Sequence, residues 1–285
     1  MLVMTAVLPR PTALPQSRQR TGEPHPGRWK EVPRVDADLH LGDESPFRRR
    51  YDTVHDKVAA LVNELDTHVA ELGTTAGWDD FVDTTARMPR FSANNIRLLR
   101  MQLPDVTDVA DFKRWRELGR SPKPGAVGLS ILVPAKTKIP LTDPDGTPLT
   151  DPKGQQMFDE RATGETTVAT VFDVSQTDGT QYTSSASIPG RAAFAAAFGP
   201  VTDVTLDEPE EVIYDVARMR LDVLGGDDTN IDVETHAVSV VIARRWGIAE
   251  PAPPAWADRS DAAVRASSVR VSRVVSRLLG TPVLP

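Results

Sequence analysis

The order in which helical and strand-like patterns follow one another limits this chain to a few fold classes. Apolar residues recur at helical spacing in residues 51–72 and again after residue 190. Between them, residues 128–134 and 166–177 form two runs rich in branched residues, with the length of strands. Helices thus precede and follow a small antiparallel sheet instead of alternating with its strands. This order predicts an α+β fold and argues against repeated βαβ units.

Further helices are predicted from apolar spacing, capping residues and terminal glycines. One short helix is expected to begin at Trp78. The others are expected over residues 92–102, 109–118, 191–199, 208–226, 232–248 and 260–279. The intervening residues 135–165 are rich in Pro, Gly, Asp and Thr, and we expect a long exposed β-hairpin or loop there. We expect no internal repeats.

The chain is expected to have a leader and two domains. Residues 1–46 contain seven Pro and no apolar period, which predicts a disordered leader. Residues 47–190 carry the first helices and the sheet, and residues 191–285 form a mainly helical C-terminal domain. The start of the chain is a poor signal peptide, and no apolar stretch approaches the ~18 residues of a spanning helix. We therefore expect a cytoplasmic protein that does not contact a membrane.

Composition excludes several kinds of site. The absence of Cys rules out disulfides, thiolate zinc sites and a cysteine nucleophile. The net charge of −7 argues against a generally basic nucleic-acid-binding protein. The charge is uneven, however, because residues 91–138 carry nine basic and four acidic residues, and residues 200–250 carry four basic and twelve acidic ones. A basic surface confined to the first half is therefore plausible.

Basic, amide and aromatic residues gather in this first half and suggest binding of single-stranded nucleic acid. Cations contact phosphates, an aromatic ring stacks on an unpaired base, and glycine permits close approach. Trp115 is the candidate stacking residue, although it could equally form core with Phe112 and Leu118. The other candidates are Asn94, Asn95, Arg97, Arg100, Gln102, Lys113, Arg114, Arg116, Arg120 and Lys123. Of the two Asn, one is expected to cap or brace the loop and the other to face the nucleic acid.

The order of these motifs resembles the N-terminal single-stranded-DNA-binding domain of ArdC-type antirestriction proteins. The resemblance spans about residues 47–190. It is carried by FSANN at 91–95, Phe-x-x-Trp at 112–115, Leu-Gly-Arg at 118–120 and VFDVSQT at 171–177. It implies binding of single-stranded DNA with little sequence preference, in plasmid, phage or mobile-element biology. Gln176 and Thr177 are either polar DNA contacts or turn-capping residues.

The C-terminal domain of that family resembles a zinc metallopeptidase with a helical HExxH motif, in which two His hold zinc and the Glu acts as base. The matching helix here reads VIYDVARMRL. Tyr214, Asp215 and Arg218 stand at the positions of the first His, the Glu and the second His, and Glu234 stands at the third-ligand position. The resemblance therefore implies a degenerate peptidase-like domain, without metal, cofactor or catalytic residues.

Three alternatives stay open at the level of sequence. The C-terminal alignment could be fortuitous, in which case the segment is a plain helical bundle. The protein could be a DNA-dependent metallopeptidase with unusual ligands, Asp215, Glu234 and His236. It could also be a protein-interaction module of a mobile element that no longer binds DNA, which a fully buried Trp115 and the lack of a cation-lined groove would favour. The acidic C-terminal half is itself a candidate surface for a protein partner.

Overall fold

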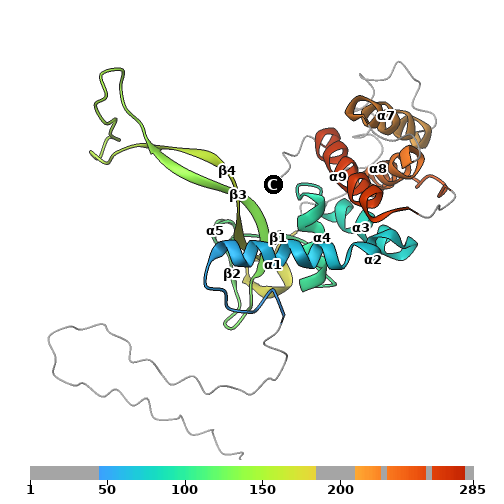
Figure 1. Ribbon diagram of the computed structural model, residues 1–285, viewed down its shortest axis with the longest axis horizontal. Helices are drawn as coiled ribbons and strands as arrows, with labels where there is room; N and C mark the ends of the chain where they lie inside the picture. Colours follow the sequence, from blue (N-terminus) through green and yellow to red (C-terminus); the bar gives the residue numbers. More distant parts are fainter. Residues whose placement is uncertain (1–44, 184–208, 226–229, 255–258, 280–285) are drawn as a thin grey trace, which may run out of the picture. The chain divides into compact units, whose positions relative to one another are not determined.

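The computed structural model describes residues 45–183, 209–225, 230–254 and 259–279. In chain order its elements are α1 (Val54–Thr67), α2 (Val69–Gly73), α3 (Thr75–Arg87), α4 (Ala93–Gln102), β1 (Val109–Ala110), α5 (Phe112–Glu117), β2 (Arg120–Pro122), β3 (Leu129–Pro140), β4 (Phe158–Asp173), the 3₁₀ turn η1 (Val174–Gln176), β5 (Thr177–Gly179), α7 (Pro209–Leu224), α8 (Ile231–Trp246) and α9 (Asp261–Leu278). The strands form an antiparallel sheet of order β1-β4-β3 and a two-stranded sheet of β2 and β5 (Figure 1). The predicted α+β fold is confirmed.

Side-chain caps fix where the helices begin. Ser92 caps α4 by accepting a hydrogen bond from the backbone N–H of Asn95, and Asp111 caps α5 by accepting from that of Arg114. The predicted helix over residues 109–118 is therefore wrong at its start. Val109 and Ala110 instead pair with the end of β4, where Val109 is fully buried. None of the described helices is long and apolar enough to cross a membrane.

One apolar core is shared by the helices before and after the sheet. The described residues, from 45 to 279, belong to one compact unit. The core contains residues of α3, α4, β3, β4, α7, α8 and α9. Helix α8 is buried over most of its length, as expected for a helix surrounded by other elements. The predicted boundary after residue 190, most of the predicted leader and the predicted helix at 191–199 lie outside the described residues.

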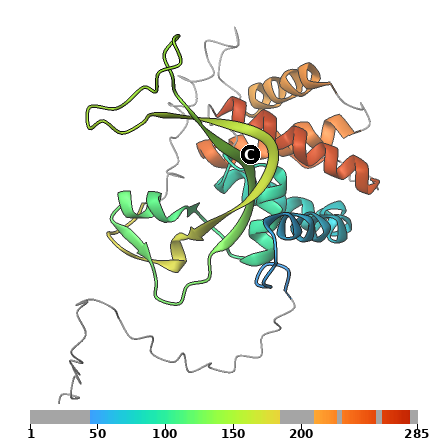
Figure 2. The same cartoon turned by 60° about the vertical axis from the view of Figure 1, so that its left-hand side comes forward.

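The two long strands form a hairpin that is buried at its base and exposed beyond it. Their pairing runs from Leu129 opposite Val171 to Pro140 opposite Phe158, with an irregularity after Pro134. Along β3, the residues change from buried at its start to exposed at its end. Residues 134–166, which we call the arm, are thus the predicted long β-hairpin (Figure 2).

The tip of the arm contains a tandem repeat, so the expectation of no internal repeats is wrong. Residues 141–148 and 149–156 share Leu, Thr, Asp, Pro and Gly at equivalent positions. Each repeat folds into the same turn, in which the Asp side chain accepts two backbone N–H groups at 2.8–3.0 Å. The glycines, Gly146 and Gly154, have φ of 85° and 78°, values that other residues rarely adopt. The repeat unit is only eight residues long, far shorter than the units of repeat folds.

Candidate nucleic-acid interface

Trp115 anchors α5 to the sheet and is not an exposed stacking residue. Its side chain is 0 % exposed, and its Nε1–H donates to the backbone oxygen of Phe172 at 2.8 Å. The Tyr182 ring packs edge-on against the indole, with ring centroids 5.1 Å apart. The sequence-based proposal that Trp115 stacks on a base is therefore corrected: apolar burial and a satisfied N–H make it a core residue.

A second aromatic residue of α5, Phe112, is exposed to solvent. Phe112, one helical turn earlier, is 51 % exposed. The guanidinium of Arg116 lies 5.8 Å from the centre of the Phe112 ring. In the alternative that the sequence left open, Phe112 formed core together with Trp115 and Leu118; the structure buries Trp115 and leaves Phe112 exposed. The signal that could have identified it is its position directly after the Asp111 cap, in the first turn of a six-residue helix.

Several cations surround Phe112 on α5 and the adjacent β2. Lys113, Arg114 and Arg116 are exposed on α5, which packs against β2. Arg114 forms an exposed ion pair with Glu117 at 3.2 Å, which leaves its charge accessible. Among the described residues, no interaction is seen for Lys113. We call this set, Phe112, Lys113, Arg114 and Arg116 with Arg120 and Lys123 at its edge, the α5 surface.

The two edge cations are partly used in holding the fold. Arg120 donates through Nε to the hydroxyl of Thr177 and through Nη2 to its backbone oxygen, both at 2.8 Å. Lys123 donates from Nζ to the backbone oxygen of Ser175 at 2.8 Å and lies 3.8 Å from a carboxylate oxygen of Asp178. Lys123 remains exposed and Arg120 half-buried. Both still contribute positive charge to the α5 surface.

Gln176 and Thr177 act as turn-capping residues. The Gln176 side-chain oxygen accepts from the backbone N–H of Asp173 at 2.9 Å, and its amide donates to the backbone oxygen of Val127 at 2.7 Å. Thr177 is buried and donates its hydroxyl to the backbone oxygen of Val174. Of the two roles left open by the sequence, turn capping is the one that the structure shows. The VFDVSQT motif is thus a strand end and its capped turn.

Two side-chain amides on α4 form hydrogen bonds with the free edge of β3, as the backbone of a neighbouring strand would. Asn95 exchanges two hydrogen bonds of 2.8 Å with the backbone N–H and oxygen of Leu132. Gln102 does the same with Ser130, at 2.7 and 2.8 Å. These amides satisfy backbone groups at the outer edge of the sheet, so they brace the fold and do not face a ligand. Asn94 is exposed instead, in a hollow beside Pro134 and Gly164.

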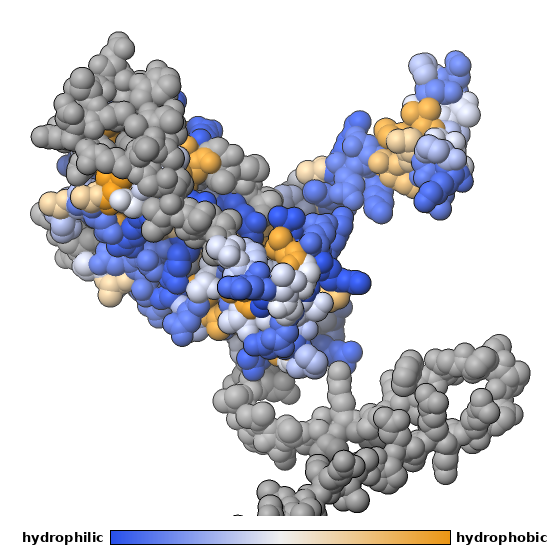
Figure 3. Space-filling model, turned by 180° about the vertical axis from the view of Figure 1, so that it is seen from behind, coloured by the Kyte–Doolittle hydropathy of each residue, from blue (hydrophilic) through white to orange (hydrophobic). Residues whose placement is uncertain are grey.

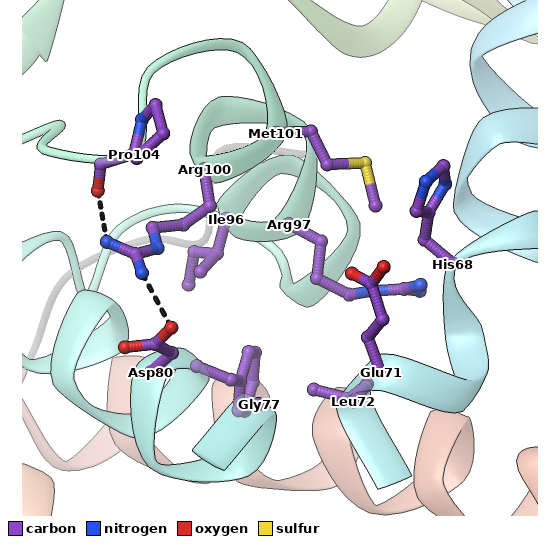
Figure 4. Close-up of a pocket in the computed structure, with 11 residues that line it drawn as sticks. His68, Glu71, Leu72, Gly77, Asp80, Ile96, Arg97, Arg100, Met101 and Pro104 are labelled. Atoms are coloured by element: carbon purple, nitrogen blue, oxygen red, sulfur yellow. Dashed lines mark hydrogen bonds and ion pairs between the residues drawn. The ribbon is translucent and has the colours of Figure 1, made fainter. Parts of the chain in front are cut away.

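Arg97 and Arg100 lie in a separate pocket of about 240 Å³ between α2, α3 and α4 (Figure 4). Arg97 is only 7 % exposed, and its Nη2 donates to the backbone oxygen of Leu65 at 2.6 Å. Burial lowers the pKa of Arg97, and the nearby charge of Arg265 lowers it further. Arg100 pairs with Asp80 at 2.7 Å. These two cations are therefore structural and are not joined to the α5 surface.

The residues that match the peptidase motif do not form a metal site. Arg218 pairs with Asp232 at 2.7 Å, while Asp215 is exposed and Tyr214 half-buried. Glu234 is fully buried, and its carboxylate accepts from Nε of Arg270 at 2.8 Å and from the hydroxyl of Ser267 at 2.5 Å. Within the described residues, no group of three His, Cys, Asp or Glu is placed to hold a metal ion.

His236 does not complete a metal site either, because it is not grouped with the other residues of the proposed ligand set. It lies within hydrogen-bonding distance of the backbone oxygen of Pro251, 3.3 Å from Nε2, and burial lowers its pKa. Asp215, Glu234 and His236 are therefore not brought together as the metallopeptidase hypothesis requires. A large part of the acidic run in residues 200–250 lies outside the described residues, so the expected partner surface there stays a prediction.

Comparisons with protein-family models, with curated proteins and with solved structures found no match to this chain. The resemblance to ArdC-type proteins thus rests on its motifs alone.

Proposed function

We propose that the protein is a non-catalytic, cytoplasmic protein that binds single-stranded DNA through the α5 surface. The observation that carries this proposal is the half-exposed ring of Phe112, set among Lys113, Arg114 and Arg116. An aromatic ring stacks on unpaired bases of any sequence, and the cations contact the phosphates on either side. Bases in a duplex are already stacked, so the same surface favours the single strand.

The architecture of α5 supports this role. A binding helix of six residues has little stability of its own, and Trp115 fixes it by its hydrogen bond to β4. The α5 surface is therefore already ordered, and little conformational entropy is lost when it binds a ligand. The choice of DNA over RNA and the plasmid, phage or mobile-element setting, with antirestriction or DNA protection as the purpose, come from the resemblance to ArdC-type proteins.

Fluorescence anisotropy with a labelled strand of about 20–30 nucleotides, competed with the same sequence as duplex at two salt concentrations, tests the proposal. Phe112→Ala is expected to weaken binding about 5- to 150-fold, the effect of losing the stacking of one base on an aromatic ring. Phe158→Ala is the matched control, because Phe158 is 49 % exposed on the arm. Absence of binding at low salt, or equal losses in both variants, would contradict the proposal.

Burial of Trp115 also favours the second candidate function, a protein-interaction module, because it removes the largest expected stacking residue. In that case single-stranded DNA does not bind, and the exposed ring of Phe112 contacts protein. Lys113 and Arg116 then make no contribution to DNA affinity. The same titration separates the two functions, because only the first predicts tight, salt-sensitive binding of the single strand.

A further inference from the structure

Three adjacent arginines lie exposed shortly before α1, and we call them the arginine turn: Arg48, Arg49 and Arg50. No other stretch of the chain has three adjacent basic residues. Among the described residues, no ion pair is seen for any of the three. Residues 45–57 carry four basic and two acidic residues, whereas the whole chain has a net charge of −7. The arginine turn is therefore a concentration of positive charge that the fold does not neutralise.

The backbone of the arginine turn is held by its own hydrogen bonds. The backbone N–H groups of Arg48 and Arg49 both donate to the backbone oxygen of Ser45 at 2.9 Å. The hydroxyl of Tyr51 donates to the backbone oxygen of Pro46 at 2.9 Å, and the guanidinium of Arg49 lies 5.9 Å from the centre of the Tyr51 ring. A ligand thus meets cations whose backbone is already ordered, and little backbone entropy is lost on binding.

Phe47 ties the arginine turn to the base of the hairpin. It packs against an apolar cluster of α1 and α4, against which Val168 of β4 also packs. Trp115 fixes α5 to the same strand through the backbone oxygen of Phe172. Val168 and Phe172 are four residues apart, which is about 13 Å along a strand. The arginine turn and the α5 surface are thus attached to nearby points of β4, and Figures 1 and 2 show both at the base of the hairpin, away from its tip.

Between these two points, one face of β4 is partly open. Val168, Thr170 and Phe172 share this face, because alternate side chains of a strand point to the same side. Thr170 is exposed and Phe172 half-buried, whereas Val171 on the opposite face is buried in the core. Gly128 lies beside them, where an added Cβ would come within 2.2 Å of the Thr170 methyl and 3.1 Å of the Phe172 ring. We call Gly128, Thr170 and Phe172 the β4 strip.

The charges around the β4 strip favour a polyanion. Residues 112–123 carry five basic residues and one acidic residue, whereas the arm carries four basic and six acidic ones. An anion held at the α5 surface is therefore attracted to the arginine turn and repelled by the arm. Guanidinium groups suit phosphate, because they donate two parallel hydrogen bonds to it. Figure 3, from the side opposite to Figure 1, shows mostly hydrophilic side chains outside the arm, so charge is the main feature that this part of the molecule offers a ligand.

We propose that the single strand bound at the α5 surface continues across the β4 strip and places its phosphates against the arginine turn. The inference rests on the function proposed above and adds a second set of contacts to it. The cations of the α5 surface and of the arginine turn then form one continuous binding path, with the β4 strip between them. A path of this kind binds strands of any sequence, because phosphates carry no sequence information.

Anisotropy titrations of the full chain with a labelled strand of about 20–30 nucleotides, at several salt concentrations, test this path. Changing all three residues of the arginine turn to Ala is expected to reduce the slope of log affinity against log salt concentration by about 2, at ~0.7 per phosphate contact. Changing them to Lys keeps the charge and is expected to keep the slope. The matched control changes three exposed arginines of α7 and α9 to Ala and is expected to leave the slope unchanged: Arg220, Arg273 and Arg277.

Cross-linking shows whether one strand reaches both surfaces, because the chain has no Cys to interfere. Arg49→Cys protein is expected to form a disulfide, on mild oxidation, with a strand that carries a thiol on an internal base. Adding Phe112→Ala is expected to lower the yield at least fivefold, since Phe112 holds the same strand. Val223→Cys protein is the control and is expected not to cross-link, because Val223 is 74 % exposed on α7.

The outcomes separate this inference from the function on which it rests. A wild-type chain that does not bind the single strand overturns both. A chain that loses affinity with Phe112→Ala, but keeps its salt slope without the arginine turn, overturns the path alone. Equal changes of slope in the α7 and α9 control overturn it too, because the overall charge is then what matters. A cross-link at residue 49 that does not depend on Phe112 shows two separate sites instead of one path.

Discussion

Two half-exposed phenylalanines distinguish the α5 surface from the arm. Phe112 and Phe158 are 51 and 49 % exposed, so neither residue type nor exposure separates them. Their neighbours do: Phe112 lies among Lys113, Arg114 and Arg116, whereas the arm that carries Phe158 has four basic and six acidic residues. Where an exposed ring takes part in binding, the charge around it favours one class of partner over another. The cations around Phe112 are why we propose nucleic acid as the ligand of the α5 surface.

The two regions also differ in how they are attached. Helix α5 is held by a buried aromatic side chain, whereas the arm is braced at its base by side-chain amides and stiffened at its tip by repeated turns. Each attachment can be weakened separately by substitution.

Trp115→Ala is expected to lower the free energy of unfolding by about 3–5 kcal/mol, because it leaves a cavity and removes the hydrogen bond to the backbone oxygen of Phe172. Phe158→Ala is expected to change it by less than about 0.5 kcal/mol, as for other exposed positions. Urea unfolding followed by circular dichroism measures both. A Trp115→Ala protein with full stability and no DNA affinity would return Trp115 to the interface.

Asn95→Ala is expected to cost about 1–3 kcal/mol of stability, because it leaves the backbone N–H and oxygen of Leu132 without their partners. Its neighbour Asn94 is exposed, and Asn94→Ala is expected to be nearly neutral. The same unfolding experiment compares the pair. Equal effects would show that the amide brace does not hold the base of the arm.

Lys113→Ala with Arg116→Ala is expected to reduce the slope of log affinity for single-stranded DNA against log salt concentration by about 1.4, at ~0.7 per phosphate contact. Lys136→Ala with Lys138→Ala removes the same charge from the arm and is expected to leave the slope unchanged. Anisotropy titrations at several salt concentrations give both slopes. A reduced slope in the arm variant would extend the nucleic-acid interface to the arm.

Asp143→Ala is expected to loosen one turn of the tip by removing the acceptor of two backbone N–H groups. The effect is local, about 1 kcal/mol, and is visible as faster hydrogen exchange at Thr147. For Asp145, an exposed acid in the same turn, no side-chain hydrogen bond is seen among the described residues, so Asp145→Ala is the control. If exchange is unchanged in both, the turns do not stiffen the tip of the arm.

Part of the site was predictable, and the reasons for the misses are physical. The basic character of residues 113–116 follows from the sequence, because neighbouring charged side chains stay close together in any fold. The sequence does not show which side of a short helix is buried. Phe112 and Trp115 are three residues apart and equally apolar, and only Trp115 contacts β4 through a hydrogen bond. Asn95 and Gln102 were expected at the interface because amides contact nucleic acid, yet the open edge of β3 lies within their reach.

The sequence by itself determined the segregated order of helices and strands, most helix starts, the long hairpin and the uneven charge, because these depend on neighbours within a few residues. The tertiary structure decided which polar groups are consumed by the fold. Arg97, Asn95, Gln102 and Glu234 bond to groups 28 to 37 residues away in the chain, and those distances close only when the core forms. A buried polar group must find such a partner, and what remains unpaired at the surface is left for function.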